Sequence, residues 1–174
     1  MADPAKVDAM RQRLGPGPIV GLSWLSHNRT SARQKSATLA GLAPLLKQSR
    51  YRFLDLQYGD TADERAALSR DTGLMLTHLD GVDLKNDLDS LAVMMMCCDV
   101  VITVCNTTAH LAAALGRPTW VLTSHERGRL WWTFLDRDDS PWYPTVKFFR
   151  QPHEGDWDTP INRAAEALAL KSPG

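Results

Sequence analysis

Small polar residues follow an apolar run near the middle of the chain, where residues 100–104 lead into Cys105, Asn106, Thr107 and Thr108. The run is rich in β-branched residues and predicts a strand buried on both faces. The alanine- and leucine-rich segment that follows predicts a helix, ended by Gly116 and Pro118 before a second apolar run. The polar residues would therefore lie at the carboxyl end of a parallel strand, where open α/β sheets bind ligands.

Chemistry at this turn depends on how the helix begins. Asn106 is a typical cap, and Thr107 and Thr108 place hydroxyls beside the unpaired N–H groups of the first turn. Such groups suit a phosphate or another anion, although an ordinary capped helix explains the turn equally well. His110 lies one turn from Asn106. It would either donate to a phosphate or ribose oxygen or pack against the next strand and bond a backbone carbonyl.

Further polar residues follow other predicted strands, on the same edge of the sheet. The basic loop after the first strand would bring a cation to the same phosphate, or it is simply solvated. Gln57 would read a base or sugar, or cap the next helix. Tryptophan in the loop after the fifth strand would stack on a base or sugar, or form part of a hydrophobic lid. The candidates from these three regions are Ser23, Arg29, Lys35, Gln57, Asp60 and Trp131.

Two other chemistries are weighed against anion binding. Asp87-Leu88-Asp89 and Asp136-Arg137-Asp138 match the metal-binding Asp-x-Asp pattern that glycosyltransferases of another fold use. The first opens a predicted helix, where acids are favoured without a metal, so we predict no metal site. Cys105 at a helix amino terminus, with His110 nearby, suggests a cysteine hydrolase. No glycine flanks this cysteine, and a histidine in the same helix is poorly directed towards it.

The elements that position these residues alternate between strand and helix. The sequence predicts an α/β fold, a single Rossmann-like three-layer domain with a mostly parallel, doubly wound sheet of six strands. The strands are expected at 19–24, 51–57, 74–76, 100–104, 119–123 and 146–149, and the helices at 39–46, 62–71, 87–98, 107–115 and 158–170. This domain would occupy residues 18–170, between an N-terminal extension, 1–17, and a C-terminal tail, 171–174.

Composition favours a cytoplasmic protein without a charged macromolecular partner. The 20 basic and 20 acidic residues cancel, so charge gives no argument for nucleic acid or membrane binding. No apolar run approaches the roughly 20 residues of a membrane span, and residues 1–6 lack the apolar core of a secretory signal. The three cysteines are Cys97, Cys98 and Cys105, a clustered and odd set that disfavours disulfides and structural zinc.

The β-turn-α unit, together with residues 139–144 and 149–152, resembles the carboxyl-terminal domain of heptosyltransferase-like family 9 glycosyltransferases. The likeness is greatest to bacterial members in which this domain follows tetratricopeptide repeats. Residues 21–24, 56–60 and 155–157 also match, so the resemblance extends over about 18–170. The turn has Asn106-Thr107-Thr108 where many heptosyltransferases have Asp-Thr-Gly or Asp-Thr-Ser, which leaves the donor sugar open.

This resemblance implies one half of a two-domain, B-type glycosyltransferase. In the family the carboxyl-terminal domain holds the nucleotide diphosphate sugar without a metal or other cofactor. The amino-terminal domain holds the acceptor and the catalytic base. We therefore expect a donor-binding domain whose partner is an acceptor-binding domain or a second copy of the chain. The alternative is a stand-alone nucleotide-binding module without catalysis.

Overall fold

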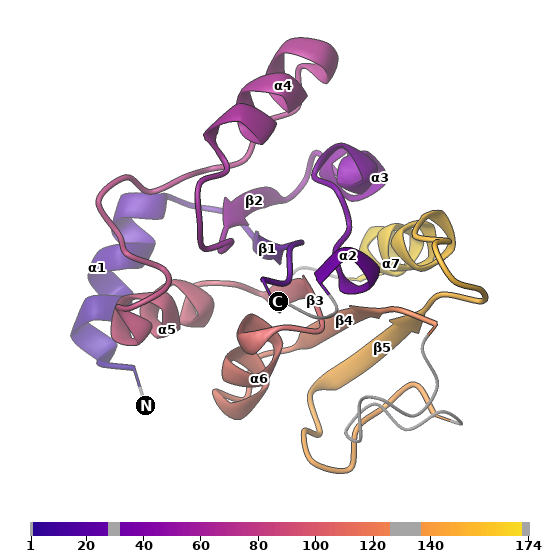
Figure 1. The fold of residues 1–174 in the computed structure, drawn as a ribbon. Coiled ribbons are helices and arrows are strands. Elements are labelled where there is room, and N and C mark those ends of the chain that lie inside the picture. Colours follow the sequence, from indigo (N-terminus) through magenta and orange to yellow (C-terminus); the bar gives the residue numbers. More distant parts are fainter. Residues whose placement is uncertain (1, 28–31, 126–136, 172–174) are drawn as a thin grey trace.

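A parallel sheet of five strands forms the centre of the molecule (Figure 1). The computed structural model of the chain describes residues 2–27, 32–125 and 137–171. The strand order is β2-β1-β3-β4-β5, and every neighbouring pair is parallel. Because β2 lies on one side of β1 and β3 on the other, the direction of winding reverses between β1 and β3. The strands are β1 (Ile19–Ser23), β2 (Arg52–Asp55), β3 (Val100–Val104), β4 (Thr119–Thr123) and β5 (Val146–Arg150).

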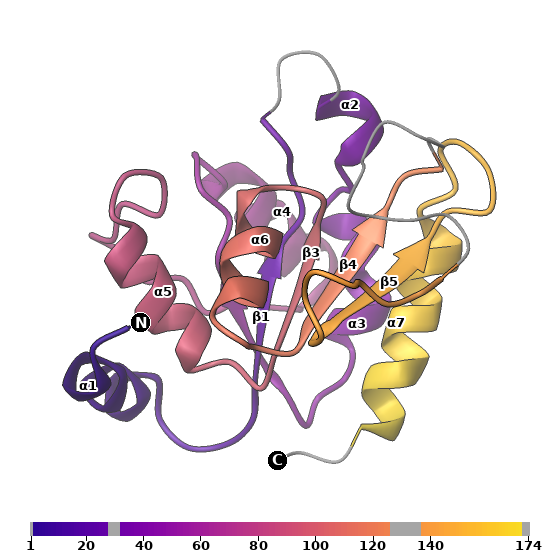
Figure 2. The ribbon, with the colours of Figure 1, turned by 90° about the horizontal axis from the view of Figure 1, so that it is seen from below.

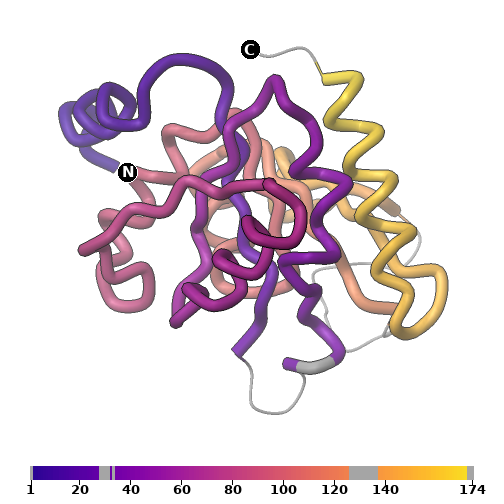
Figure 3. The backbone as a smooth tube through the Cα atoms, turned by 90° about the horizontal axis from the view of Figure 1, so that it is seen from above, coloured from indigo at the N-terminus to yellow at the C-terminus, as the bar shows by residue number. Residues whose placement is uncertain are grey.

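Helices cover both faces of the sheet and complete three layers (Figures 1 and 2). One face is covered by α1 (Pro4–Leu14), α5 (Leu88–Met96) and α6 (Thr107–Ala114). The other is covered by η1 (Ala40–Leu42), α3 (Ala43–Leu46), α4 (Ala62–Thr72) and α7 (Asp158–Leu170). Figure 3 shows α7 running beside the η1–α3 segment. The short helix α2 (Ala32–Lys35) lies near the carboxyl ends of the strands, to which the arrowheads in Figure 2 point.

The neighbouring strands β1 and β3 are buried along their whole length, as their apolar, β-branched sequences predict. Their side chains point alternately to the two faces of the sheet, so successive residues pack against opposite helical layers. Gly21 of β1 is the position of closest approach. A Cβ atom there would collide with the Leu56 side chain and lie 3.0 Å from the Cys98 sulfur. The layer of α5 can pack closely on β1 only because residue 21 has no side chain.

The helices predicted at 62–71, 87–98, 107–115 and 158–170 are confirmed, with bounds that differ by a few residues. The Asp87 side chain accepts from Ser90 N at 2.9 Å and caps α5, and Asn106 caps α6 by accepting from Ala109 N at 3.3 Å. Gly116 adopts a φ of 73° directly after α6, as the predicted stop requires.

The predicted sixth strand at 74–76 is wrong, and the sheet has five strands in the part of the chain that the structure describes. Only Thr77 pairs with β2, through Thr77 N to Phe53 O at 2.7 Å and Asp55 N to Thr77 O at 2.8 Å. Leu74 and Leu76 pack against the core from outside the sheet, and Met75 is 74% exposed. Three apolar residues were sufficient for packing but too few to form a strand with its own ladder.

Two helical predictions also need correction. The segment 39–46 is a 3-10 turn followed by one turn of α-helix rather than a continuous helix, because Pro44 has no N–H to donate. Its leucines are nevertheless buried, as the pattern predicted. The helix α1, within the predicted extension, was missed although Asp3 and Pro4 are typical start signals and Gly15 a typical stop. It packs against α5 and is fixed further by Arg52, which donates to Gly15 O.

None of the described helices is both long and apolar enough to cross a membrane.

Candidate functional site: a polar crevice between β1 and β3

A polar pocket of about 320 Å³ lies at the carboxyl ends of β1 and β3. It is therefore located at the position where the winding of the sheet reverses, which is the common ligand position of doubly wound folds. We call it the crevice. It is lined by Ser26, His27, Lys35, Tyr58, Cys105, Asn106 and Thr107. Three predicted site residues, Lys35, Asn106 and Thr107, are thus brought together from α2 and the start of α6.

Asn106 connects the two strands that border the crevice. Its Nδ2 donates to Ser23 Oγ at 2.8 Å and to Leu25 O at 3.1 Å. Its Oδ1 caps α6 and also accepts from Thr103 Oγ1 at 3.1 Å. Both ends of the amide are therefore occupied, and Asn106 holds the loop after β1 against the amino terminus of α6.

Gln57 performs the same task between β1 and β2. Its Oε1 accepts from Ser23 Oγ at 3.0 Å, Trp24 N at 3.0 Å and Leu25 N at 2.8 Å, while its Nε2 donates to Tyr58 O at 2.9 Å. The side chain is buried and its polar atoms are used within the protein. Ser23 is buried as well. These two predicted site residues lie beneath the crevice and fix its floor.

The amino terminus of α6 supplies the donors. Thr107 is exposed and lines the crevice, whereas Thr108 is buried. By helix geometry the N–H groups of both residues have no partner within the helix. Together with the helix dipole they make this end of α6 suitable for negative charge.

The positive charges of two side chains, Lys35 and Arg150, influence Cys105 in the turn before α6. Burial raises the pKa of the Cys105 thiol to about 12, although the charges of Lys35 and Arg150 lower it. Both cations therefore lie within electrostatic range of the turn that precedes α6. Lys35 was predicted from the basic loop, whereas Arg150 was not, because a charged residue at the end of the last strand carries no distinctive sequence signal.

His110 lies in α6 away from the lining of the crevice. Its Nδ1 is 3.2 Å from the Tyr143 hydroxyl, and the two rings meet edge to face with centroids 5.8 Å apart. Partial burial lowers the pKa of His110, because the charged imidazolium loses hydration there. The structure places the ring beside the segment before β5, and its predicted contact with a phosphate stays a prediction.

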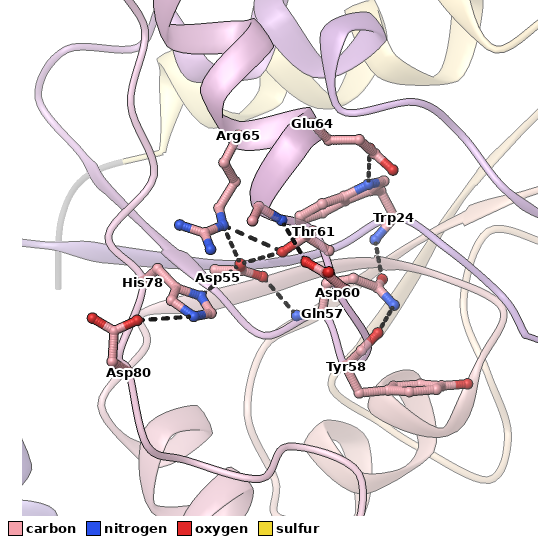
Figure 4. A network of polar contacts seen from close by, with 11 residues as sticks. Trp24, Asp55, Gln57, Tyr58, Asp60, Thr61, Glu64, Arg65, His78 and Asp80 are labelled. Atoms are coloured by element: carbon pink, nitrogen blue, oxygen red, sulfur yellow. Dashed lines mark hydrogen bonds and ion pairs between the residues drawn. The ribbon is translucent and has the colours of Figure 1, made fainter.

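Asp60 is exposed and its carboxylate accepts from Ala62 N at 3.0 Å, at the start of α4. A buried network that sequence reasoning missed lies close by (Figure 4). Asp55 is fully buried and its Oδ2 meets His78 Nδ1 at 3.0 Å, Thr61 Oγ1 at 3.2 Å and Arg65 Nε at 3.5 Å. A carboxylate within the apolar strand 51–57 was the available signal. The network fixes the start of α4 and the 77–80 segment to β2.

A ring pair forms one wall of the crevice. The rings of His27 and Tyr58 lie with centroids 4.7 Å apart, and the His27 ring also covers Gly59. Tyr58 was not considered as a site residue, since a single aromatic residue after a strand does not differ from a core residue in sequence. Arg29 and Trp131, two further predicted site residues, lie outside the described residues.

One residue of each acidic pair has a structural partner. Asp87 caps α5, and hydrogen bonds from Ser90 lower the pKa of its carboxyl group. Asp138 faces Arg150 at 4.0 Å and Arg163 at 3.7 Å. Asp136 lies outside the described residues. Within the described ranges, no three His, Cys, Asp or Glu side chains gather in a metal-binding arrangement.

A larger cavity, of about 650 Å³, lies at the opposite edge of the sheet. It is bordered by α1, the 15–18 turn and the start of β3, and includes Arg11, Gln12 and Asp99. The Asp99 carboxylate accepts a hydrogen bond from Ile19 N at 2.7 Å and so holds the start of β1 beside the start of β3. We favour the smaller crevice because the helix amino terminus, the strand ends and the lysine meet there.

Comparison with known proteins supports this view of the fold. The chain is 38% identical over 170 residues to Protein FlbA of Caulobacter vibrioides, covering 95% of this chain and 28% of FlbA. Among solved structures it is similar to a family 9 glycosyltransferase from Veillonella parvula, with a TM-score of 0.65, 15% identity and 97% of this chain covered. It is also similar to the ADP-heptose lipopolysaccharide heptosyltransferase II of E. coli, with a TM-score of 0.63, 19% identity and 98% covered.

These matches define the class of fold. The chain folds like one half of a family 9 glycosyltransferase, since it spans 51% and 52% of the two solved chains. It spans just over a quarter of FlbA. No protein-family model matches the chain.

Proposed function

We propose that this chain is the donor-binding half of a glycosyltransferase and that the crevice binds the diphosphate of a nucleotide diphosphate sugar. The observation that carries the proposal is the convergence of Lys35 and the amino terminus of α6 at the β1–β3 switch point. The family 9 fold supports the same conclusion.

The proposed chemistry follows from the charge that builds up during transfer. When the bond between the sugar and the diphosphate breaks, the leaving group gains negative charge that must be stabilised. The Lys35 ammonium group and the N–H groups of Thr107 and Thr108 are donors for this charge. The start of α6 is fixed before binding by Asn106, which caps the helix and holds it to the loop after β1. We propose that this set acts without a metal ion.

Transfer also needs a base against the acceptor hydroxyl. The chain spans only about half of the family 9 structures that it resembles. We therefore propose that the acceptor and the base come from another domain or from a second copy, and that the 174-residue chain binds donor without transferring sugar. Turnover by this chain alone, with nucleotide sugars and a panel of glycan acceptors, would show that the base lies within it.

A binding module without catalysis remains the second candidate, because the same crevice serves both functions. The cysteine hydrolase has less support. Cys105 is buried with a raised pKa, and the His110 ring meets Tyr143. A nucleophilic cysteine instead needs a partly exposed thiol with a lowered pKa.

A thermal-shift screen tests the proposal. A ligand at a hundredfold excess over its Kd stabilises the fold by about 2.7 kcal/mol, which for this length raises Tm by on the order of 5–10 °C. We expect such a shift with at least one nucleoside diphosphate, with or without magnesium. Lys35→Ala should remove most of the shift, whereas the control Lys47→Ala, an exposed lysine after α3, should keep it. A shift that requires magnesium would contradict metal-independent binding.

A further inference from the structure

Four buried polar atoms near the carboxyl ends of β4 and β5 have no hydrogen-bond partner among the described residues. They are Thr108 Oγ1, Thr123 Oγ1, Ser124 Oγ and Gln151 Nε2. The residues Thr108, Thr123 and Gln151 are 1%, 2% and 4% exposed. Folded proteins rarely leave such groups unsatisfied, so a cluster of them calls for an explanation.

Three of the four residues stand at the carboxyl ends of two paired strands, since Thr123 ends β4, Ser124 follows it and Gln151 follows β5. Thr123 is the last residue of β4 and accepts from the backbone N–H of Gln151 at 3.0 Å. The side-chain Oε1 of Gln151 accepts from His125 N at 3.2 Å. This contact fixes the orientation of the amide, because only its oxygen can accept. Nε2 is therefore left as a donor at the end of β5, the strand paired with β4.

Two of the four residues, Thr108 and Thr123, lie on the side of the sheet that α6 covers, next to the crevice. Val121 of β4 packs with Ala109 and Ala113 of α6, so the alternation of side chains puts Thr123 on the α6 side as well. Thr108, also in α6, follows Thr107, which lines the crevice. A ligand that extends from the crevice over the ends of β4 and β5 would reach the unsatisfied atoms.

We propose that Thr108, Thr123, Ser124 and Gln151 form a subsite for the hydroxyl groups of the sugar in the bound nucleotide diphosphate sugar. The inference rests on the proposed function, which places the diphosphate in the crevice. The three hydroxyls both donate and accept, the amide N–H donates, and all four groups are neutral. They match the hydroxyls of a hexose or related glycosyl group, which also donate and accept hydrogen bonds.

An isosteric substitution separates this proposal from the diphosphate site. Thr123→Val removes one unsatisfied hydroxyl and keeps the shape of the side chain. Thr119→Val is the matched control in the same strand, since Thr119 is equally buried but its hydroxyl already donates to Arg117 O at 2.9 Å. Ser124→Ala provides a second variant at the proposed subsite.

The measurement is calorimetric titration of ADP, GDP and UDP and of ADP-glucose, GDP-mannose and UDP-glucose into each protein. The wild type should bind one nucleotide sugar more tightly than its parent diphosphate. Thr123→Val and Ser124→Ala should each reduce that preference, by roughly tenfold for one good hydrogen bond, without changing diphosphate affinity. Thr119→Val should keep the preference.

Three results would count against the subsite. Equal affinity of the wild type for the diphosphates and all three nucleotide sugars overturns it while leaving the proposed function intact. An unchanged preference in both variants, with a lower Tm for Thr123→Val, identifies a structural water as the partner and also overturns it. Failure of the wild type to bind any diphosphate overturns the proposed function, and the subsite with it.

Discussion

The amides of Asn106 and Gln57 determine the shape of the crevice, Asn106 from its lining and Gln57 from a buried position below it. Each connects backbone and side-chain groups on two strand ends, and neither has a polar atom to spare. The sequence predicted Asn106 both as a helix cap and as a binding residue, and Gln57 as a residue that reads a base or sugar or caps the next helix. The structure gives them a positioning role, because the ends of β1 and β2 carry backbone N–H groups that need acceptors once they are buried. A sequence does not reveal such partners when they lie more than 30 residues apart.

The double role of Asn106 leads to a prediction. Asn106→Ala removes the cap of α6 and the contact with Leu25 O, so we expect the free energy of unfolding to fall by about 1–2 kcal/mol and nucleotide affinity to fall with it. Denaturant unfolding and calorimetric titration measure the two effects.

Asp87→Ala is the matched control, because Asp87 caps α5 through a similar contact with Ser90 N. Its stability loss should be similar, at about 1 kcal/mol, with nucleotide affinity unchanged. Equal losses of affinity in both variants would mean that Asn106 acts only through stability.

Cys105 provides a prediction with a defined pH dependence. Burial raises its pKa to about 12 from an ordinary value of 9.0, so the folded thiol holds its proton more tightly than the unfolded one. The stability from this group is complete below pH 9 and is lost as the pH rises towards 12. At pH 7 iodoacetamide should label Cys105 of the folded protein far more slowly than a model thiol, as followed by mass spectrometry. Rapid labelling would restore the cysteine hydrolase as a candidate.

Among the elements, long apolar runs were predicted well and short ones poorly. The strands β1, β3 and β4 and the helix α6 follow from β-branched runs and from the Asn106 and Gly116 signals. The segment 74–76 failed because three apolar residues fit a packed loop and a strand equally well. The helix α1 was not predicted, because the glycines and prolines at 15–18 indicate a break in regular structure there.

The close packing of β1 against α5 gives a further prediction. Gly21→Val would place atoms where the side chains of Leu56 and Cys98 lie, so we expect a loss of about 1–3 kcal/mol in the free energy of unfolding. Urea denaturation followed by circular dichroism measures the loss. An unchanged midpoint would mean that β1 and its neighbours shift easily, and the rigid floor that we assign to the crevice would have to be abandoned.

For the whole molecule, the strand order β2-β1-β3-β4-β5 explains why the candidate residues meet. Residues 23–26, 57–58 and 105–108 are far apart in the chain, but the parallel strands bring them to one edge. The sequence predicted this gathering because the carboxyl ends of parallel strands share an edge. It did not predict which side chains line the pocket and which support it, since that depends on hydrogen bonds across strands.

The most direct test of the account is to locate a bound nucleoside diphosphate by NMR. The backbone amide signals of the isotopically labelled chain are followed as the diphosphate that gives the largest thermal shift is added. We predict that the largest changes occur at Thr107 and Thr108, with further changes at Lys35 and Tyr58, and that they saturate together. Changes centred instead on Arg11, Gln12 and Gly17, around the larger cavity at the opposite edge of the sheet, would contradict the account.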